Sequence, residues 1–582
     1  MTGHALWIAV ALPLLAGLSC LLPRLPDKVA RFWLCSVPAP ALWAAWMTPL
    51  NVPLDMPWLL LGARFELLDV TRIFLVFTSL LWWVAGFYAV RYLAHDHHLK
   101  RFAFFWLMSY TGNIGLIVTG DIPSFYTYFA LMGFSAYALV IHTAQPSAVR
   151  AGRLYLGMTI LGEVMILGGL LMIAHAGESL LIREAVPAIA DSPYRPLAMG
   201  LIIFGFGVKT GLLPLHGWLP LAHPAAPTPA SAVLSGSMIK AGLLGWITFL
   251  PGGIVSYPVW GSIMIALGVA GAFYAVVIGL TQTHPKSNLA YSSISQMGVM
   301  TICIGIGLAE AADWTTAGLI AAVYALNHAF AKGALFLGVG VVQAEPVRPR
   351  VHRRIILAGM MLAALAIAGA PMTGGALAKR ALKYLAPAAG DVWAPALDVI
   401  FPLSALATTL LLTRLLYMLW RSMVDPNRVP DDHPGLMPSW AFTLLGVAFM
   451  AWLSIYHLQL PISTAPFSLD DIAKSALPIA AGLIIGIIAW RFLRVPKRPV
   501  PAGDVLLPVV WLGNKFTHWW VRWIATPIER WDINSDRWRT RFVPERQAHD
   551  RVVQTDTRIR AFEISGAFFV FLMILLMITL LS

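Results

Sequence analysis

The chain contains little charge. Of its 582 residues only 12% are Asp, Glu, Lys or Arg, and 58% are hydrophobic. A soluble domain carries about 25% charged residues, so this composition excludes an ordinary soluble protein and indicates one embedded in a lipid bilayer. The net charge of +13 then points to basic loops that orient membrane segments, and we expect no nucleic-acid partner.

Cysteine is also scarce, and the few present lack the spacing of a disulfide framework or a metal site. No phosphate-binding glycine loop and no nucleophile motif occurs, so we expect no catalytic site, metal or cofactor. The run His95–His98 is a weak metal candidate because it lies in a short loop beside Lys100. The three cysteines are Cys20, Cys35 and Cys303.

Long apolar runs are abundant. Runs of about 18 residues or more can cross the roughly 30 Å hydrocarbon core, and their continuous rather than alternating character favours helices over a barrel. The sequence therefore predicts an all-α polytopic membrane protein with about sixteen transmembrane helices. The predicted spans are 4–22, 30–48, 71–92, 101–119, 122–142, 152–175, 197–216, 228–250, 258–281, 289–308, 314–342, 354–386, 397–421, 438–457, 475–494 and 561–581.

The loops between these spans alternate in charge. Basic loops, such as those with Lys286 and with Arg353 and Arg354, alternate with acidic loops such as the one with Glu66 and Asp69. By the positive-inside rule the basic loops are cytoplasmic. A multi-pass protein with both termini on the non-cytoplasmic side follows, and the membrane that we expect is a bacterial inner (plasma) membrane.

Several ionisable residues fall inside the predicted spans. A charge at mid-membrane costs about 2.5–3.5 kcal/mol on insertion scales, so such residues are candidates for function. Burial disfavours the charged amine, so a row of lysines with histidine between them could pass protons. Lys240 and Lys379 could instead extend to the interface, and His328 could be a packing residue. The candidates are Glu163, Lys209, Lys240, His328, Lys332 and Lys379.

Two of the apolar runs are interrupted. Pro214 follows Lys209 within one run, and Pro371, Gly374 and Gly375 precede Lys379 in another. Proline removes a helix hydrogen bond, and paired broken spans indicate inverted repeats with a site between them. The two runs are five spans apart, so the repeats would insert with opposite topology.

The basic, tryptophan-rich stretch after the fifteenth span suits a helix lying on the cytoplasmic interface. Together these features divide the chain into six predicted segments. They are 1–100, N-terminal transmembrane helices; 101–250, a first inverted repeat or half-channel; 258–421, a second; 438–494, additional transmembrane helices; 495–560, a lateral interfacial segment; and 561–582, a C-terminal anchoring helix.

The stretch KTGLLPLHGWLPLAHPAAPTPASAVLSGSMIKAG (209–242) closely resembles the signature of the antiporter-like subunits of respiratory complex I, Mrp cation/proton antiporters and membrane-bound hydrogenases. Three further stretches resemble that family in the same order: HPKSNLAYSSISQMG (284–298), NHAFAKGALFLGVG (327–340) and GAPMTGGALAK (369–379). The resemblance covers roughly residues 60–420. It implies fourteen core helices, two inverted five-helix repeats and proton translocation along a central polar axis.

The resemblance also implies individual roles. Lys209 would be the lysine of the first half-channel and Lys240 that of the next helix. Lys332, with His328 beside it, would be the central lysine. Lys379 would be the terminal lysine facing the exit.

One family feature is missing. The glutamate that family members usually carry in the fifth helix, paired with the lysine of the seventh, is Ala130 here. Glu163, in the following helix, matches a position that is Asp in some family members. Among the acidic residues inside predicted spans, Glu163 is the nearest to Ala130.

The sequence therefore predicts a proton-translocating subunit of a multi-subunit membrane complex, with other membrane subunits, the lipid bilayer and H⁺ as partners. Such a complex could be of the NADH/quinone oxidoreductase or hydrogenase type. One alternative is a Na⁺ or K⁺/H⁺ antiporter component of Mrp type. Another is a non-pumping subunit that couples a partner, for example in inorganic-carbon uptake, which the alanine at position 130 favours.

Overall fold

A computed structural model describes residues 4–344, 350–425, 433, 435–458, 468–492 and 500–503. Apart from these last four residues, the predicted lateral segment 495–560 and the final span 561–581 lie outside the described part. Within it the helices are joined by loops and turns, and two short paired strands are present, β1 (Leu54–Met56) and β2 (Ala63–Phe65). Nine helical stretches of the described residues are long and apolar enough to cross a membrane.

The first half of the chain contains helices that overlap the first eight predicted spans, and three short helices that lie between those spans. They are α1 (His4–Ser19), α2 (Asp27–Ser36), α3 (Ala39–Met47), α4 (Asp69–Tyr92), α5 (Leu99–Val118), α6 (Ile122–Val140), α7 (Pro146–Gly177), α8 (Ile182–Ala188), η1 (Ile189–Asp191), α9 (Arg195–Thr210), α10 (Leu219–Ala225), α11 (Thr228–Val233), η2 (Leu234–Met238) and α12 (Lys240–Phe249). The short α8, η1 and α10 are the three that lie between the spans.

The second half continues in the same way. Its helices are α13 (Pro258–Thr281), α14 (Pro285–Ala309), η3 (Ala311–Asp313), α15 (Trp314–Ala344), α16 (Arg350–Ala368), α17 (Gly374–Leu385), η4 (Ala386–Ala389), α18 (Gly390–Val424), α19 (Met437–Leu458) and α20 (Leu469–Phe492). Each span predicted before residue 495 overlaps a helix or a series of short helices. The predicted span 30–48 is divided between α2 and α3 near Pro38, whose ring cannot donate a backbone hydrogen bond.

Both predicted helix interruptions are present and share one construction. After α9 comes Gly211 with φ +76°, then the loop that holds Pro214 and leads to α10. After α16 comes Gly369 with φ +87°, then Pro371 and the start of α17 at Gly374. A left-handed glycine is the usual way to end a helix, and the proline that follows prevents the helix from resuming at once.

A third irregularity was not predicted. Between α11 and α12 the chain forms the π-helical turn η2, in which the Ile239 amide donates to the Leu234 carbonyl at 3.2 Å. Single π turns leave backbone oxygens out of the regular α-helical ladder and often occur at functional sites. This turn ends directly before Lys240.

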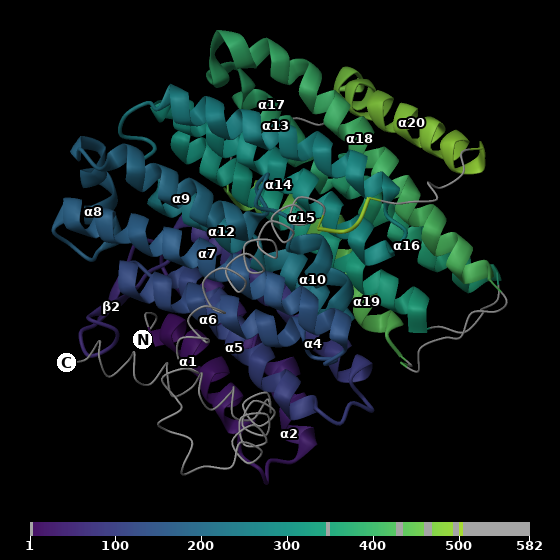
Figure 1. Ribbon diagram of the computed structural model, residues 1–582, viewed down its shortest axis with the longest axis horizontal. Helices are drawn as coiled ribbons and strands as arrows, with labels where there is room; N and C mark the ends of the chain where they lie inside the picture. The colour runs from purple at the N-terminus through teal and green to yellow at the C-terminus, as the bar shows by residue number, and fades with distance from the viewer. Residues whose placement is uncertain are drawn as a thin grey trace, which may run out of the picture. The chain divides into compact units, whose positions relative to one another are not determined.

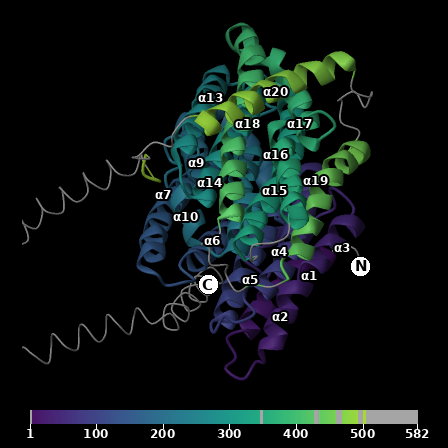
Figure 2. The same cartoon turned by 90° about the vertical axis from the view of Figure 1, so that its right-hand side faces the viewer.

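The described helices of Met1–Asp55 and Arg64–Gly503 form one unit. In both views α14 and α15 run through its middle, and α20 lies along α18 at the end opposite α1 and α2 (Figures 1 and 2). The Arg414 guanidinium of α18 lies 4.9 Å from the ring centroid of Trp490 in α20. Since α14 and α15 are almost wholly buried, polar side chains on them are enclosed by protein rather than lipid.

Candidate functional site

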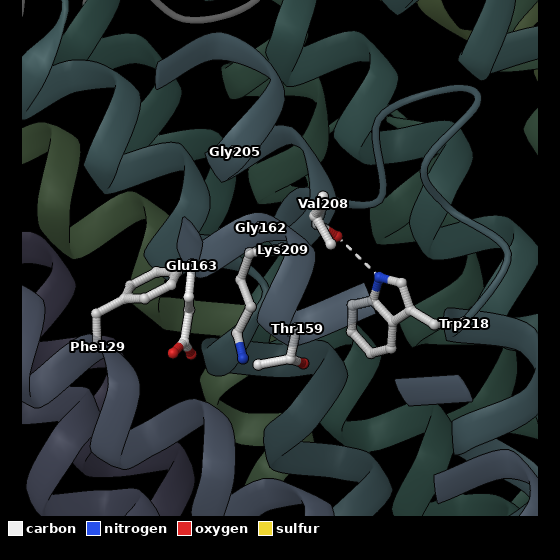
Figure 3. A pocket seen from close by; sticks show the side chains of 8 residues that line it. All are labelled: Phe129, Thr159, Gly162, Glu163, Gly205, Val208, Lys209 and Trp218. Carbon is white, nitrogen blue, oxygen red and sulfur yellow. Dashed lines mark hydrogen bonds between the residues drawn. The ribbon is translucent and has the colours of Figure 1, made fainter. Parts of the chain in front are cut away.

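The Lys209 side chain ends in a pocket enclosed by α6, α7 and α9. Lys209 stands in the last turn of α9, directly before the break. Its Nζ donates to the Tyr155 hydroxyl at 3.3 Å and lies 5.8 Å from the ring centroid of Phe129. The Trp218 indole donates to the Val208 carbonyl at 2.8 Å and so ties the loop after the break back to α9 (Figure 3). The break therefore both ends the helix and closes the lysine pocket.

Glu163 of α7 shares this pocket with Lys209. The two side chains point the same way into it (Figure 3), and each lies within electrostatic range of the other. Glu163 is only 4% exposed, and its Oε1 has no hydrogen-bond partner among the described residues. A carboxylate buried in this way needs a nearby positive charge, and Lys209 is the cation that lines the pocket with it.

The same carboxylate lies against α6, the helix in which the family glutamate is missing. A Cβ built on Gly133 would stand 2.7 Å from Glu163 Oε1, and Tyr126 is within electrostatic range of Glu163. Tyr126, Ala130 and Gly133 are four and three residues apart and share one helix face. Glu163 thus brings a carboxylate from α7 to the face of α6 on which Ala130 stands.

Two further predicted lysines lie deeper in the unit, and each donates to a backbone oxygen. Lys240 Nζ is 2.5 Å from the Ser235 carbonyl oxygen in the π turn η2. Lys332 Nζ, on α15, is 2.9 Å from the Leu289 carbonyl oxygen of α14. Both side chains have no solvent exposure, so neither reaches the membrane interface in the way a surface lysine can.

Histidines accompany these lysines. His328 stands one turn before Lys332 on α15 and is within electrostatic range of Lys240 as well. His223, on α10, was not predicted as a site residue, although it lies inside the stretch 209–242 that carries the family resemblance. It stacks on Phe336 with ring centroids 4.6 Å apart and is reached by the charges of Lys240 and Lys332. Neither histidine has a hydrogen-bond partner for its ring nitrogens among the described residues.

Lys286 was assigned by sequence to a cytoplasmic loop, but it is 5% exposed. It stands in the first turn of α14, and its Nζ donates to the Ala226 carbonyl oxygen between α10 and α11 at 2.9 Å. Its charge also reaches His223. Lys286 therefore belongs to the same polar interior as Lys240 and Lys332.

At the second helix interruption, as at Lys240 and Lys332, a lysine amine donates a hydrogen bond to a backbone carbonyl oxygen. Lys379 Nζ donates to the Ala368 carbonyl oxygen, the last of α16, at 2.6 Å. On α14, Gln296 joins its helix to α15 and α18, because it accepts from the Tyr324 hydroxyl at 2.9 Å and donates to Thr408 Oγ1 at 3.0 Å. Gln296, Tyr324 and Thr408 were not predicted, because uncharged polar residues are too common in helices to signal a site.

The loop with the histidine run has a different arrangement from a metal site. Asp96 Oδ2 lies 2.9 Å from His142 Nε2, and its Oδ1 accepts from the His98 backbone amide at 2.6 Å. The His142 hydrogen bond is the main cause that lowers the pKa of Asp96 to about 2. Within the described ranges no group of three metal-ligating side chains gathers. Asp96 thus joins the loop after α4 to the end of α6.

Membrane-length helices around a row of buried amines define a polytopic membrane protein with a polar interior. Residues 119–401 match the family described as "NADH:quinone oxidoreductase/Mrp antiporter, TM". The chain is 28% identical over 465 residues to hydrogenase-4 component B of Escherichia coli K12, covering 74% of this chain and 65% of that protein. It is 27% identical to the putative antiporter subunit mnhA2 of Staphylococcus haemolyticus, and the match covers 83% of this chain and 65% of that protein.

A solved structure, that of the Mrp complex from Dietzia sp. DQ12-45-1b, has a chain of the same fold. The TM-score is 0.72 at 22% identity, with 91% of this chain and 61% of that chain covered. Residues 119–401 thus match the antiporter-like membrane subunit family, the relatives are similar over a longer stretch, and the polytopic helical fold predicted from the sequence is confirmed. The chain spans slightly less than two thirds of the two curated relatives.

Proposed function

We propose that the protein is a proton-translocating, antiporter-like subunit of a multi-subunit complex in a bacterial inner membrane, and that H⁺ moves through its buried amines. The observation that carries the proposal is the set of the buried Lys240 and Lys332 and the half-buried Lys379, each hydrogen bonded to a backbone carbonyl oxygen. A neutral acceptor holds an ammonium less firmly than a carboxylate does, so each amine can release its proton.

Helix irregularities supply two of these oxygens. The Ser235 carbonyl belongs to the π turn, and the Ala368 carbonyl is the last of α16. Backbone oxygens at a helix C-terminus carry partial negative charge. An interrupted helix can therefore stabilise a proton on a nearby lysine without providing a fixed counter-ion.

The first half-channel differs because its lysine has a carboxylate neighbour. Under this proposal Glu163 serves Lys209 in place of the missing glutamate at position 130. The opposite charge favours the ammonium form of Lys209, so movement of either side chain would change how firmly the proton is held.

The test replaces the central lysine. We expect Lys332→Ala to abolish proton uptake by vesicles that hold the intact complex, while the complex still assembles. Lys332→Arg should be inactive as well, because arginine keeps its proton at any accessible pH. Lys100→Ala is the matched control, since Lys100 is near the surface and its Nζ donates to the Pro23 carbonyl at 3.2 Å. Normal uptake by Lys332→Ala at normal protein level would refute the proposal.

A second candidate is cation exchange, in which Na⁺ or K⁺ moves against H⁺. The match to a putative antiporter subunit over 83% of this chain supports it. The two candidates separate by ion dependence: a Na⁺ or K⁺ gradient alone should drive proton movement only under the exchange reading. The relatives do not favour the coupling-only alternative, because those that are named belong to hydrogenase, antiporter and Mrp systems.

A further inference from the structure

A cavity of about 490 Å³ opens at one end of the helices, separate from the lysine pocket. The N-terminal ends of α4 and α15 and the C-terminal ends of α5 and α12 surround it, with α8 across one side. All the lining residues belong to the unit formed by the described helices. Its outer rim includes exposed Asp69 and Thr315, so the cavity reaches the protein surface.

The cavity wall carries a buried carboxylate. The Glu66 side chain is 6% exposed, and its Oε2 lies 3.2 Å from Arg183 of α8, whose own side chain is 49% exposed. Arg183 also donates to Asn51 Oδ1 at 3.0 Å. Asp69 at the rim adds a second negative charge, so the lining carboxylates outnumber the one lining arginine. The lining residues thus carry one net negative charge, while the charges of Arg64 and Arg72, outside the lining, also reach Glu66 and Asp69. A cleft whose lining is net negative concentrates cations.

An unpaired hydroxyl faces the same space. Thr119 lines the cavity and is 8% exposed, yet its Oγ1 has no hydrogen-bond partner among the described residues. Buried hydroxyls normally find a partner in protein or ordered water. Its position in the wall of a cavity of this size indicates that water or a hydrated ion supplies the missing hydrogen bond.

The floor of the cavity is close to the lysine row. Leu116 of α5 and Leu244 of α12 are the innermost lining residues on their helices, and both are 1% exposed. Lys240 stands four residues before Leu244 on the same helix, which is a rise of about 6 Å. Leu116 and Leu244 therefore lie between the cavity and the backbone of Lys240, whose Nζ points away from the cavity towards the Ser235 carbonyl oxygen.

We propose that this cavity is an aqueous vestibule through which monovalent cations reach the lysine row from the acid-lined face, and that Glu66, held by Arg183, sets its preference for cations. The proposal rests on the proposed function and adds the access route. The face is the one predicted to be non-cytoplasmic. Leu116 and Leu244 are the barrier that must move, or admit a chain of water, for an ion to pass.

Cysteine labelling tests the vestibule without requiring transport. Thr119→Cys is introduced into the full chain in its complex, with Cys35→Ser to remove the one native cysteine that is not buried. Vesicles of each orientation are treated with a cationic or an anionic methanethiosulfonate, which modify thiolates in water. Leu403→Cys, 47% exposed in the middle of α18, is the control for a membrane-facing position. Thr248→Cys, also in the cavity wall, replaces Thr119→Cys if that variant does not assemble.

We expect Thr119→Cys to react only from the acid-lined face, and about tenfold faster with the cationic reagent once each rate is divided by that reagent's rate with a small thiol in solution. Adding Glu66→Gln should reduce that preference, whereas Leu403→Cys should react with neither reagent. The vestibule is overturned if Thr119→Cys and Thr248→Cys resist both ionic reagents but react with neutral N-ethylmaleimide, which would mean that lipid fills the cavity. Equal rates with both reagents would overturn the role of Glu66. Because labelling needs no turnover, these outcomes are independent of the result for Lys332→Ala.

Discussion

Glu163 Oε1 lies so close to Gly133 that a Cβ built on this glycine would stand 2.7 Å from it. The two residues come from neighbouring helices, α7 and α6, and Lys209 completes the group from α9. Only glycine lets the carboxylate approach α6 this closely. The charge that α6 itself lacks at Ala130 is therefore supplied across a helix–helix contact.

The first prediction concerns that charge. We expect Glu163→Gln to lower proton transport at least tenfold, about 1.4 kcal/mol, because Lys209 loses the one carboxylate that lines its pocket among the described residues. Adding Ala130→Glu should partly restore transport, since position 130 shares a helix face with Gly133. The measurement is proton uptake by vesicles at matched complex levels.

Glu178→Gln is the control for this series, because Glu178 ends α7 outside the pocket. If Glu163→Gln and the double variant both transport normally, a carboxylate–lysine pair does not control the first half-channel. The coupling-only reading would then gain weight.

The second prediction concerns Gly133, the glycine that Glu163 approaches. Gly133→Ala should push the Glu163 carboxylate aside, because the flexible end of that side chain gives way more easily than backbone does. We expect transport to fall several-fold with little change in the melting temperature of the purified complex, since misplacement of a reacting group is costly even when folding is not affected. Gly157→Ala is the matched control, with nothing within 4 Å of its added methyl group. Equal transport by both variants would contradict the prediction.

The third prediction concerns the second break. A Cβ on Gly375 would collide with the backbone carbonyl oxygen of Ala366, which cannot move away without distorting α16. Gly375→Ala should therefore destabilise the protein by about 1–3 kcal/mol, seen as a lower melting temperature in detergent. Gly271→Ala, whose nearest neighbour would be 3.9 Å away, should be nearly neutral. If the two variants melt alike, the contact at the break is not tight.

The fourth prediction is a pH dependence at the Asp96–His142 pair. The pKa of Asp96 is lowered from its usual 3.8 to about 2, first by the hydrogen bond to His142. A carboxyl group with a lowered folded-state pKa contributes stability above its unfolded pKa and loses it as the pH falls towards the folded value. Wild-type protein should therefore lose melting temperature between about pH 4 and 2 more steeply than Asp96→Asn. In the control variant Asp27→Asn the melting temperature should fall with pH as steeply as in the wild type. If it falls equally steeply in Asp96→Asn, the Asp96–His142 pair does not stabilise the protein.

The fifth prediction addresses the stretch from residue 501 onward. Its tryptophans and arginines suit a helix lying at the membrane interface, so we expect deletion of 501–560 together with the final span to impair assembly of the complex more than membrane insertion of the core. Co-purification of partner subunits with the truncated chain measures this. Full recovery of all partners would show that the segment does not brace the complex.

The positions of the helices could be predicted because hydrophobic length and proline leave direct marks in the sequence. The predicted span 258–281 has the same first and last residues as α13, and a helix ends shortly before each of the predicted interruptions at Pro214 and Pro371. The division of 30–48 and the π turn were missed. Pro38 sits in an apolar run that remains long enough to cross the membrane, and a π turn changes no hydrophobic pattern.

Buried ionisable residues could likewise be selected as candidates, because charge inside an apolar run is costly. Their partners could not. Lys332 and the Leu289 carbonyl are 43 residues apart, and the contact depends on how α14 packs against α15. Lys286 was assigned to a loop because a lysine next to a proline at a span boundary gives no sign that tertiary packing will cover it.

Backbone acceptors have a consequence for any mutational survey of this protein. Replacing Ser235, Leu289 or Ala368 by another residue removes a side chain but leaves the carbonyl oxygen to which a lysine donates. An alanine scan would therefore identify the lysines and overlook their acceptors. Amide-to-ester replacement at the following residue, which makes the preceding carbonyl a weaker acceptor, would expose them.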